Sequence, residues 1–497
     1  MIDHLVLGFS VAFTFQNLLM AFVGCIVGTA IGVLPGVGPL ATISLLLPLT
    51  FGLDPITSMI MLAGIYYGAQ YGGSTSAILL NLPGEVTAVV TTLEGHKMAR
   101  AGRAGAALAV AAIGSFFAGT VATLVVAMAG PVLTAVGMAF GPAEYFSLIL
   151  LGLIVTTVLA QGNLFKSLAM IVLGVALGLV GTDLQSGQLR FTLGFMELFE
   201  GVGFVPLSMG LFGIAEIIRN LEDPENRAGS VARVGSLWLT RKEFKRSVPP
   251  VLRGTVLGSV LGVLPGGGLA LSTFASYMLE RKVSKYRHEF GNGAIEGVAG
   301  PESANNAASQ TSFIPMLTLG IPANAVMALM IGALMIQGIQ PGPRMISEQP
   351  TLFWGLIASM WIGNLMLLVI NLPLIGVWVS LLKVPYKTLY PAILMFCAIG
   401  AYSVNNSVFD VYQMVLFGIA GYFLIKLHFE PAPLLIGFVL GPMLEEYLRR
   451  TMVLSRGDMI VFLERPISAA FLAISALVLL AMIVPSVRRK KDEALEE

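Results

Sequence analysis

The chain has 497 residues, of which 56% are hydrophobic and only 11% are charged, and its formal net charge is +1. Soluble proteins carry about 25% charged residues, so this composition excludes an ordinary water-soluble fold, and the charge gives no electrostatic reason to bind nucleic acid. The two cysteines and four histidines are scattered, and no common catalytic motif is complete, which argues against a metal centre and an enzyme. Long apolar runs, such as 104–128 and 351–382, predict an all-α polytopic membrane protein with about 12 spans.

The first unusual element is Gly32-Val-Leu-Pro-Gly-Val-Gly38, which interrupts an apolar stretch. Pro35 cannot donate a backbone hydrogen bond and glycine tolerates positive φ, so we expect one helix to end here and another to begin over 39–51. Such a broken helix or hairpin at membrane depth exposes carbonyls that can bind a cation. We therefore select Gly36 and Gly38 as candidate cation-binding residues. A tightly packed turn, which needs glycine only for space, is the alternative.

Small polar residues are concentrated next in the run 67–76, Tyr-Gly-Ala-Gln-Tyr-Gly-Gly-Ser-Thr-Ser, which leads to Asn81-Leu-Pro-Gly84. Buried hydroxyls and amides are costly unless they are paired, so we expect this run to line something polar. The candidate substrate-binding residues of this half are Ser74, Thr75, Ser76 and Asn81. Contacts between helices through Ser and Thr, which are common in membranes, are the alternative.

A polar segment, 219–253, follows and contains eight basic residues. The positive-inside rule places it in the cytoplasm, together with the basic tail that ends the chain. The predicted organisation is a first transmembrane repeat (1–218), a cytoplasmic linker (219–247), a second transmembrane repeat (248–450), and a C-terminal helix with a basic cytoplasmic tail (451–497).

The second half repeats the motifs of the first half in the same order. Gly262-Val-Leu-Pro-Gly-Gly-Gly268 matches 32–38 at an offset of 230 residues (262 − 32), and Leu319-Gly-Ile-Pro-Ala323 matches 80–84 at an offset of 239 (319 − 80). The polar run 301–311 is the partner of 67–76. The additional candidates are Gly266, Gly268 and Ser303 for a cation, and Asn305, Asn306, Thr311 and Asn324 for the substrate.

Basic loops exchange places between the two halves. The loop 96–103 has three Lys or Arg residues, whereas its counterpart 335–342 has none; 281–287 has four, whereas 51–57 has none. Equivalent loops are therefore predicted to face opposite sides, which is the pattern of inverted-topology repeats. Four arginines disagree with this scheme, which places them outside: Arg449, Arg450, Arg456 and Arg465.

Four glutamates border the polar motifs: Glu85, Glu94, Glu296 and Glu302. Each is a candidate coupling carboxylate, although we expect each of them to lie in a wetted loop. Motifs rich in hydroxyls and carbonyls, with few buried carboxylates, favour sodium over protons as the coupling ion.

Together these motifs resemble the large membrane subunit of the tripartite tricarboxylate transporter family, and Gly300-Pro-Glu-Ser-Ala-Asn-Asn-Ala307 is the most specific of them. The resemblance covers essentially the whole chain. It implies a bacterial inner-membrane secondary transporter that takes up citrate or related carboxylates with a sodium or proton gradient. It also implies two partners, a small four-helix membrane subunit and a periplasmic substrate-binding protein, and an elevator-like movement. One departure is Ile321-Pro-Ala323 in place of a second Leu-Pro-Gly. An anion channel or a membrane scaffold of another complex is the alternative function.

Overall fold

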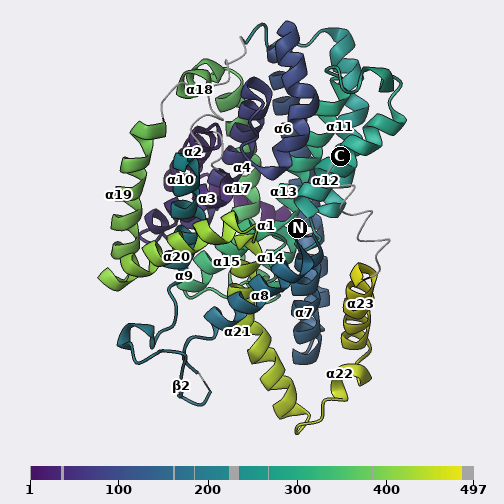
Figure 1. The fold of residues 1–497 in the computed structure, drawn as a ribbon. Helices are drawn as coiled ribbons and strands as arrows, with labels where there is room; N and C mark the ends of the chain where they lie inside the picture. The colour runs from purple at the N-terminus through teal and green to yellow at the C-terminus, as the bar shows by residue number, and fades with distance from the viewer. Residues whose placement is uncertain are drawn as a thin grey trace.

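The computed structural model describes residues 2–34, 38–159, 163–183, 185–222, 234–266, 268–382 and 386–483. Within these residues the chain is almost entirely helical (Figure 1), as the sequence predicts for an all-α membrane protein. The described strands form one short hairpin, in which β1 (Gly181–Thr182) pairs antiparallel with β2 (Leu189–Arg190).

The helices that precede the linker are α1 (Ile2–Ala12), α2 (Phe15–Gly32), α3 (Pro39–Leu46), α4 (Pro55–Leu80), α5 (Val89–Thr91), α6 (Ala104–Met138), α7 (Pro142–Leu159), α8 (Leu164–Gly178), α9 (Phe204–Ser208) and α10 (Ala215–Glu222). Short 3-10 and π-helical turns connect several of them: η1 (Leu47–Thr50), η2 (Val86–Ala88), η3 (Thr92–His96), η4 (Ala99–Arg103), η5 (Met196–Leu198) and η6 (Met209–Ile214).

The helices that follow the linker are α11 (Arg241–Leu261), α12 (Gly268–Val283), α13 (Glu296–Thr311), α14 (Phe313–Leu319), α15 (Ala325–Ile336), α16 (Met345–Glu348), α17 (Pro350–Asn371), α18 (Ile375–Leu381), α19 (Tyr386–Asn405), α20 (Val408–Lys426), α21 (Pro431–Leu454), α22 (Val461–Glu464) and α23 (Pro466–Ile483). One 3-10 turn, η8 (Arg287–Glu289), precedes α13.

Five helices of the described chain are long and apolar enough to cross a membrane: 15–32, 99–138, 204–222, 350–371 and 408–426. Other apolar helices are shorter; α15, for example, has 12 residues, whereas about 20 are needed to cross the hydrocarbon layer. The total of about 12 spans stays a prediction.

Both glycine motifs interrupt helices, as the sequence predicts. In the first half α2 ends at Gly32 and α3 begins at Pro39. In the second half α11 ends at Leu261 and α12 begins at Gly268. Because proline lacks the N–H that a continuing helix would need, each break is local and could be predicted without knowledge of the tertiary structure.

Two helix pairs show the internal repeat in their packing. Three glycines of α2 lie against the backbone of α4, and two glycines of α11, together with Gly262 directly after it, lie in the same way against α13. The contacts are Gly24 with Met61, Gly28 with Ile65, Gly32 with Ala69, Gly254 with Gly300, Gly258 with Ala304 and Gly262 with Ala308. A Cβ atom on Gly28 would lie 2.3 Å from the carbonyl oxygen of Ile65, so only glycine permits this approach. The offsets, 230 (254 − 24) and 239 (300 − 61), are those of the sequence motifs.

Helices α4 and α13 form the centre of the molecule. Every residue of α13, and every residue of α4 from Thr57 to Leu80, is buried. Helix α6 packs on α13 and α17 packs on α4, so each half covers the central helix of the other half. The polar runs 67–76 and 301–311 therefore face protein and not lipid, as polar side chains in a membrane require.

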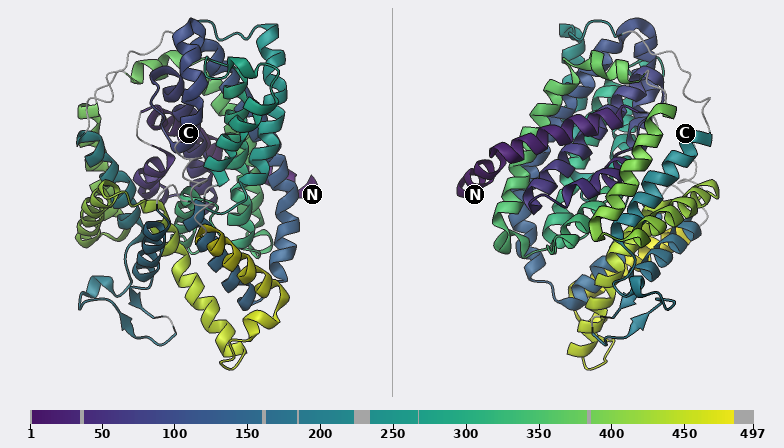
Figure 2. Two further views of the ribbon diagram at one scale, coloured as in Figure 1. Left: turned by 45° about the vertical axis from the view of Figure 1, so that its right-hand side comes forward. Right: turned by 90° about the vertical axis from the view of Figure 1, so that its left-hand side faces the viewer.

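A second group of helices lies beside this centre. Helices α7, α8, α21 and α23 pack against one another at the lower end in Figure 1, and α19 and α20 lie at one side; Figure 2 shows both groups from two further directions. The β hairpin projects near α21, to which Arg190 is joined by an ion pair with Glu445.

Ion pairs compensate three of the four arginines that disagree with the charge pattern. The pairs are Arg449 with Asp183 and Glu445, Arg450 with Glu446, and Arg465 with Glu144. Each pair has little net charge, but the positive-inside rule counts Lys and Arg residues and not net charge, so these arginines still disagree with the predicted topology. The basic tail at 488–491 and the linker residues 223–233 lie outside the described residues.

Candidate functional site

The two polar runs meet where α4 and α13 pack together. Ser74 Oγ donates a hydrogen bond of 2.7 Å to Glu302 Oε2. Asn305 Nδ2 donates one of 3.0 Å to Gln70 Oε1 and lies 3.5 Å from Glu85 Oε1. Side chains from opposite halves of the sequence thus form one continuous polar group in the interior.

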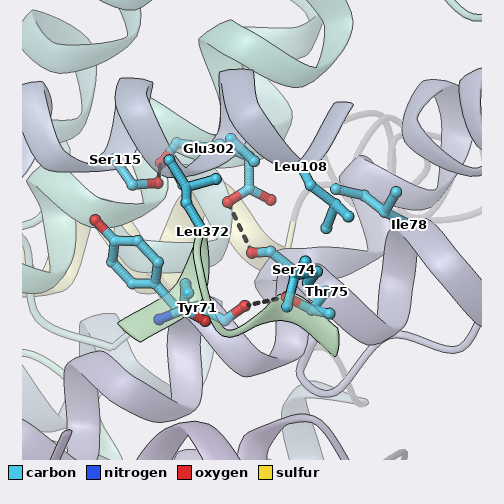
Figure 3. Close-up of a pocket in the computed structure, with 12 residues that line it drawn as sticks. Tyr71, Ser74, Thr75, Ile78, Leu108, Ser115, Glu302 and Leu372 are labelled. Atoms are coloured by element: carbon cyan, nitrogen blue, oxygen red, sulfur yellow. Dashed lines mark hydrogen bonds between the residues drawn. The ribbon is translucent and has the colours of Figure 1, made fainter. Parts of the chain in front are cut away.

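Glu302 is the only formally charged side chain that lines the cavity at this junction (Figure 3). It is 1% exposed. Its Oε1 atom accepts a hydrogen bond from Thr91 Oγ1, in addition to the bond that Oε2 accepts from Ser74. Within the described chain, no Lys, Arg or His forms an ion pair with Glu302. The sequence prediction that this residue lies in a wetted loop was wrong, because the residue lies within α13 and faces α4.

The same prediction was wrong for two further glutamates. Glu94 is fully buried and accepts hydrogen bonds from the backbone N–H groups of Gly291, Gly293 and Ala294. Glu296 is 2% exposed and is paired with Arg246. In both cases protein donors replace the water that we expected around the carboxylate. Glu85 is only partly buried.

Asn306 extends the polar group to α6. Its Nδ2 atom donates hydrogen bonds to Ser115 Oγ (2.6 Å) and to the carbonyl oxygen of Glu302 (3.1 Å). We did not select Ser115 from the sequence, because it lies inside the apolar run 104–128. A hydroxyl residue in such a run was the available signal, since membrane helices place polar residues against protein.

The cavity beside Glu302 is small and mostly closed by apolar side chains such as Leu108 and Leu372 (Figure 3). Its polar lining consists of Tyr71, Ser74, Thr75, Ser115, Glu302 and Asn371. Its volume is about 20 Å³, which suffices for one water-sized species and is far below the roughly 300 Å³ of a typical small-molecule site. In this conformation the cavity cannot hold a tricarboxylate.

The second glycine motif contacts the second proline loop. Gly266 has a φ of +96°, and its N–H donates a hydrogen bond of 2.8 Å to the carbonyl oxygen of Ala323. In the first half, Gly38 has an extended backbone and lies beside the carbonyl oxygen of Gly84, the counterpart of Ala323. Gly36 lies outside the described residues. Gly268 is the first residue of α12.

The remaining selected residues make local contacts. Ser76, Ser303 and Thr311 each donate to a carbonyl oxygen of their own helix. Asn81 ends α4 in the left-handed conformation, with a φ of 60°. Asn324 begins α15, and its Oδ1 atom accepts a hydrogen bond of 3.0 Å from the N–H of Met327. The structure thus brings Ser74, Asn305 and Asn306 together at the site. The two other selected asparagines, Asn81 and Asn324, lie at helix ends.

Comparison with known proteins identifies the chain by family. Residues 18–436 match the model of the tripartite tricarboxylate transporter TctA family. A relative from Agrobacterium vitis, described as an uncharacterized 52.8 kDa protein in the TAR-I ttuC' 3' region, is 59% identical over 497 residues, which is 100% of this chain and 99% of the relative.

A second relative from Agrobacterium vitis, an uncharacterized protein in the TAR-II ttuC' 3' region, is 61% identical over 240 residues, which is 48% of this chain and 99% of that protein. No solved structure matches the chain. The family match covers most of the chain and confirms the resemblance that the motifs indicate. The chain is a multi-pass membrane subunit of a tripartite tricarboxylate transporter, not a member of an enzyme family, and it belongs to the TctA family.

Proposed function

We propose that this chain is the subunit through which a carboxylate anion crosses the bacterial inner membrane, driven by a cation gradient. A periplasmic binding protein delivers the substrate, and a small four-helix membrane subunit completes the complex. The observation that supports this proposal is the contact between the polar runs of α4 and α13 in the fully buried centre of a family member.

The amides and hydroxyls at this junction are suited to a carboxylate. Asn305 and Asn306 have N–H donors, and Ser74 and Thr75 have hydroxyls that can donate to carboxylate oxygens. We propose that the other candidates also contribute to binding of the carboxylate, further from the junction: Ser76, Asn81, Thr311 and Asn324. Because the cavity of about 20 Å³ is too small for such an anion, binding requires that α4 and α13 become accessible from one side of the membrane at a time.

An elevator-like movement of inverted repeats suits this arrangement. Helices α2–α4 and α11–α14, with the loops that follow α4 and α14, contain all the selected motifs and would form the moving part, whereas α7–α10 and α19–α23 would remain fixed. Single cysteines in place of Arg100 and Ile339, in a variant without Cys25 and Cys397, should react with an impermeant reagent from opposite sides of the membrane. Reaction from the same side would exclude inverted repeats.

The glycine motifs are proposed as backbone cation ligands through Gly36, Gly38, Gly266 and Gly268. Ser303, which lies within α13, is proposed as a further ligand. Gly266→Ala opposes a φ of +96° and would place a Cβ atom 2.6 Å from the Cα atom of Thr156. A ligand role predicts that the sodium concentration for half-maximal uptake rises in the protein that folds. A packing role predicts a lower melting temperature with an unchanged sodium dependence.

Uptake into liposomes tests the function itself. The chain, the small subunit and the binding protein are reconstituted, and labelled di- and tricarboxylates are supplied with a sodium or a proton gradient imposed separately. We expect saturable uptake that requires both the binding protein and one gradient. Passive flux that needs neither would indicate a channel and contradict the proposal.

A further inference from the structure

We propose that the cavity beside Glu302 is a binding site for one sodium ion, with the carboxylate of Glu302 and the amide oxygen of Asn371 as its principal ligands. This site is separate from the glycine motifs, which lie at the helix breaks. Its role in transport rests on the function proposed above, but its existence does not.

The first argument is the uncompensated charge of Glu302. The four other buried glutamates of the described chain are all compensated: Glu94 by backbone N–H groups, Glu144 by Arg465, Glu280 by Arg253 and Glu296 by Arg246. Glu302 receives only the hydroxyl hydrogen bonds of Ser74 and Thr91. A buried carboxylate is costly unless it has a counter-charge, a proton or several backbone N–H donors, and two hydroxyl groups provide none of these.

The second argument is an unpaired acceptor in the same cavity, which favours a cation over a proton. Asn371 lines the cavity, and its Nδ2 atom donates a hydrogen bond of 2.9 Å to the carbonyl oxygen of Leu367. Its Oδ1 atom is buried and has no hydrogen-bond partner. A proton on Glu302 would neutralise the carboxylate but would not itself give this oxygen a partner, whereas one cation in the cavity can be bound by both groups.

The third argument is the size and chemistry of the cavity. Its volume of about 20 Å³ matches one small ion or water molecule. Every polar atom that its lining side chains can offer, apart from the amide nitrogen of Asn371, is an oxygen, the ligand type that hard cations prefer. With a single carboxylate, a monovalent ion leaves the site neutral, whereas a divalent ion would leave an excess positive charge.

The position of the cavity suggests how the ion would be coupled to the substrate. Its walls come from α4 and α6 of the first half and from α13 and the α17–α18 junction of the second half. Asn305, a proposed substrate residue, follows Glu302 by about one helical turn. A bound cation would remove the negative charge that repels a carboxylate there, so each ligand should strengthen binding of the other.

Thermal unfolding of the purified chain in detergent tests the site without substrate, partners or a gradient. The melting temperature is measured against sodium chloride, with choline chloride keeping the ionic strength constant. A ligand that binds only the folded state stabilises it by RT ln(1 + L/Kd), where L is the ligand concentration, so the melting temperature continues to rise with the logarithm of the ligand concentration above Kd. We expect such a logarithmic rise with sodium and a much smaller one with potassium.

Three variants locate the effect. Glu302→Gln should abolish the sodium response. Asn371→Leu, which keeps the number and branching of the side-chain heavy atoms, should raise the sodium concentration needed by roughly tenfold, the effect of losing one good ligand. Glu144→Gln also removes a buried carboxylate, but at the distant pair with Arg465, and should retain the full sodium response. If Glu302→Gln does not fold, Asn371→Leu and Glu144→Gln still decide the matter.

Two results would overturn the assignment. One is a sodium response that is the same in wild type, Glu302→Gln and Asn371→Leu. The other is a wild-type protein that ignores sodium but becomes more stable as the pH is lowered, which would indicate a proton in place of the ion. Sodium binding without carboxylate uptake by the complete three-part system would overturn the proposed function and leave this inference standing.

Discussion

Two glutamates of the same helix, α13, show how differently this protein holds a buried carboxylate. Glu296 lies at the start of the helix and accepts two hydrogen bonds of 2.8 Å from Arg246. Glu302 lies further along, and its carboxylate accepts hydrogen bonds only from hydroxyl groups. A well-oriented ion pair offsets the desolvation of both of its charges, whereas hydroxyls leave a charge uncompensated. The first arrangement fixes the helix in place, and the second leaves the site able to bind a cation.

Removing the partner of the compensated glutamate should have the largest effect on stability. The side chains of Arg246 and Glu296 are 11% and 3% exposed, and breaking a buried pair costs about 3–5 kcal/mol. We expect Arg246→Ala to lower the melting temperature and the yield of folded protein, equally with and without sodium. The double variant with Glu296→Gln should recover part of the loss, because it also removes the unpaired charge.

Arg450→Ala is the matched control for that experiment. Its side chain is 57% exposed and pairs with Glu446, and exposed pairs contribute at most about 1 kcal/mol. If Arg246→Ala were as stable as Arg450→Ala, water would have to reach Glu296, and the contrast between the two carboxylates would disappear.

Replacing the two glutamates by glutamine should give opposite results. Glu302→Gln removes an uncompensated charge at nearly constant volume, so the melting temperature in sodium-free buffer should stay the same or rise. Glu296→Gln should lower it. Sodium-driven uptake by the complete system should fall by roughly tenfold or more in Glu302→Gln, since one strong ion ligand is lost. Normal uptake by this variant would show that the carboxylate is not needed for coupling.

A finer contrast separates the cation from the substrate. Thr91 contacts Glu302 but is not a proposed substrate residue, whereas Asn305 contacts Gln70 and not Glu302. Each hydrogen bond of this kind is worth about 1–3 kcal/mol. We expect Thr91→Ala to raise the sodium concentration for half-maximal uptake about tenfold. Asn305→Ala should raise the carboxylate concentration for half-maximal uptake by a similar factor. Equal shifts of both constants in both variants would mean that the ion and the substrate share one site.

Local features of the fold could be predicted from the sequence. The breaks at Gly32 and Leu261 follow from the conformational limits of proline, and the inward orientation of 67–76 and 301–311 follows from the cost of polar groups in lipid. Both arguments use only neighbouring residues and the membrane as a solvent.

The environment of each glutamate could not be predicted, because it depends on partners that are distant in the sequence. Ser74 and Glu302 are 228 residues apart, and the pair Arg246 and Glu296 is 50 apart. Asn371 was missed because it is one of only two asparagines in an apolar helix, α17. The signal that could have identified it is that rarity, since an amide in a membrane helix is costly unless it meets a partner.

The smallest predicted effect concerns a compensated carboxylate away from α4 and α13, Asp183 of the β hairpin, which is 6% exposed. Ser186 Oγ donates a hydrogen bond of 2.5 Å to it, and Arg449 donates one of 3.0 Å. These contacts, with the Ser186 hydroxyl as the largest contribution, hold the pKa of Asp183 well below its usual range. A pKa lowered by folding stabilises the folded state at pH values above the ordinary Asp pKa of about 3.9, and this stabilisation is lost as the pH falls towards the folded-state value.

Acid should therefore loosen the hairpin from α21 before it affects the buried centre. We expect hydrogen exchange of 181–190 to accelerate between about pH 5 and about pH 3 relative to that of α13, after correction for intrinsic exchange rates. Asp183→Asn should show faster exchange already at neutral pH and a smaller further change with acid, because it lacks the charge that Arg449 pairs with. Glu464→Gln, at an exposed position on α22, should behave as the wild type. If Asp183→Asn responds to acid as strongly as the wild type, another group causes the loosening. The contacts of Asp183 with Ser186 and Arg449 would then contribute nothing measurable to holding the hairpin.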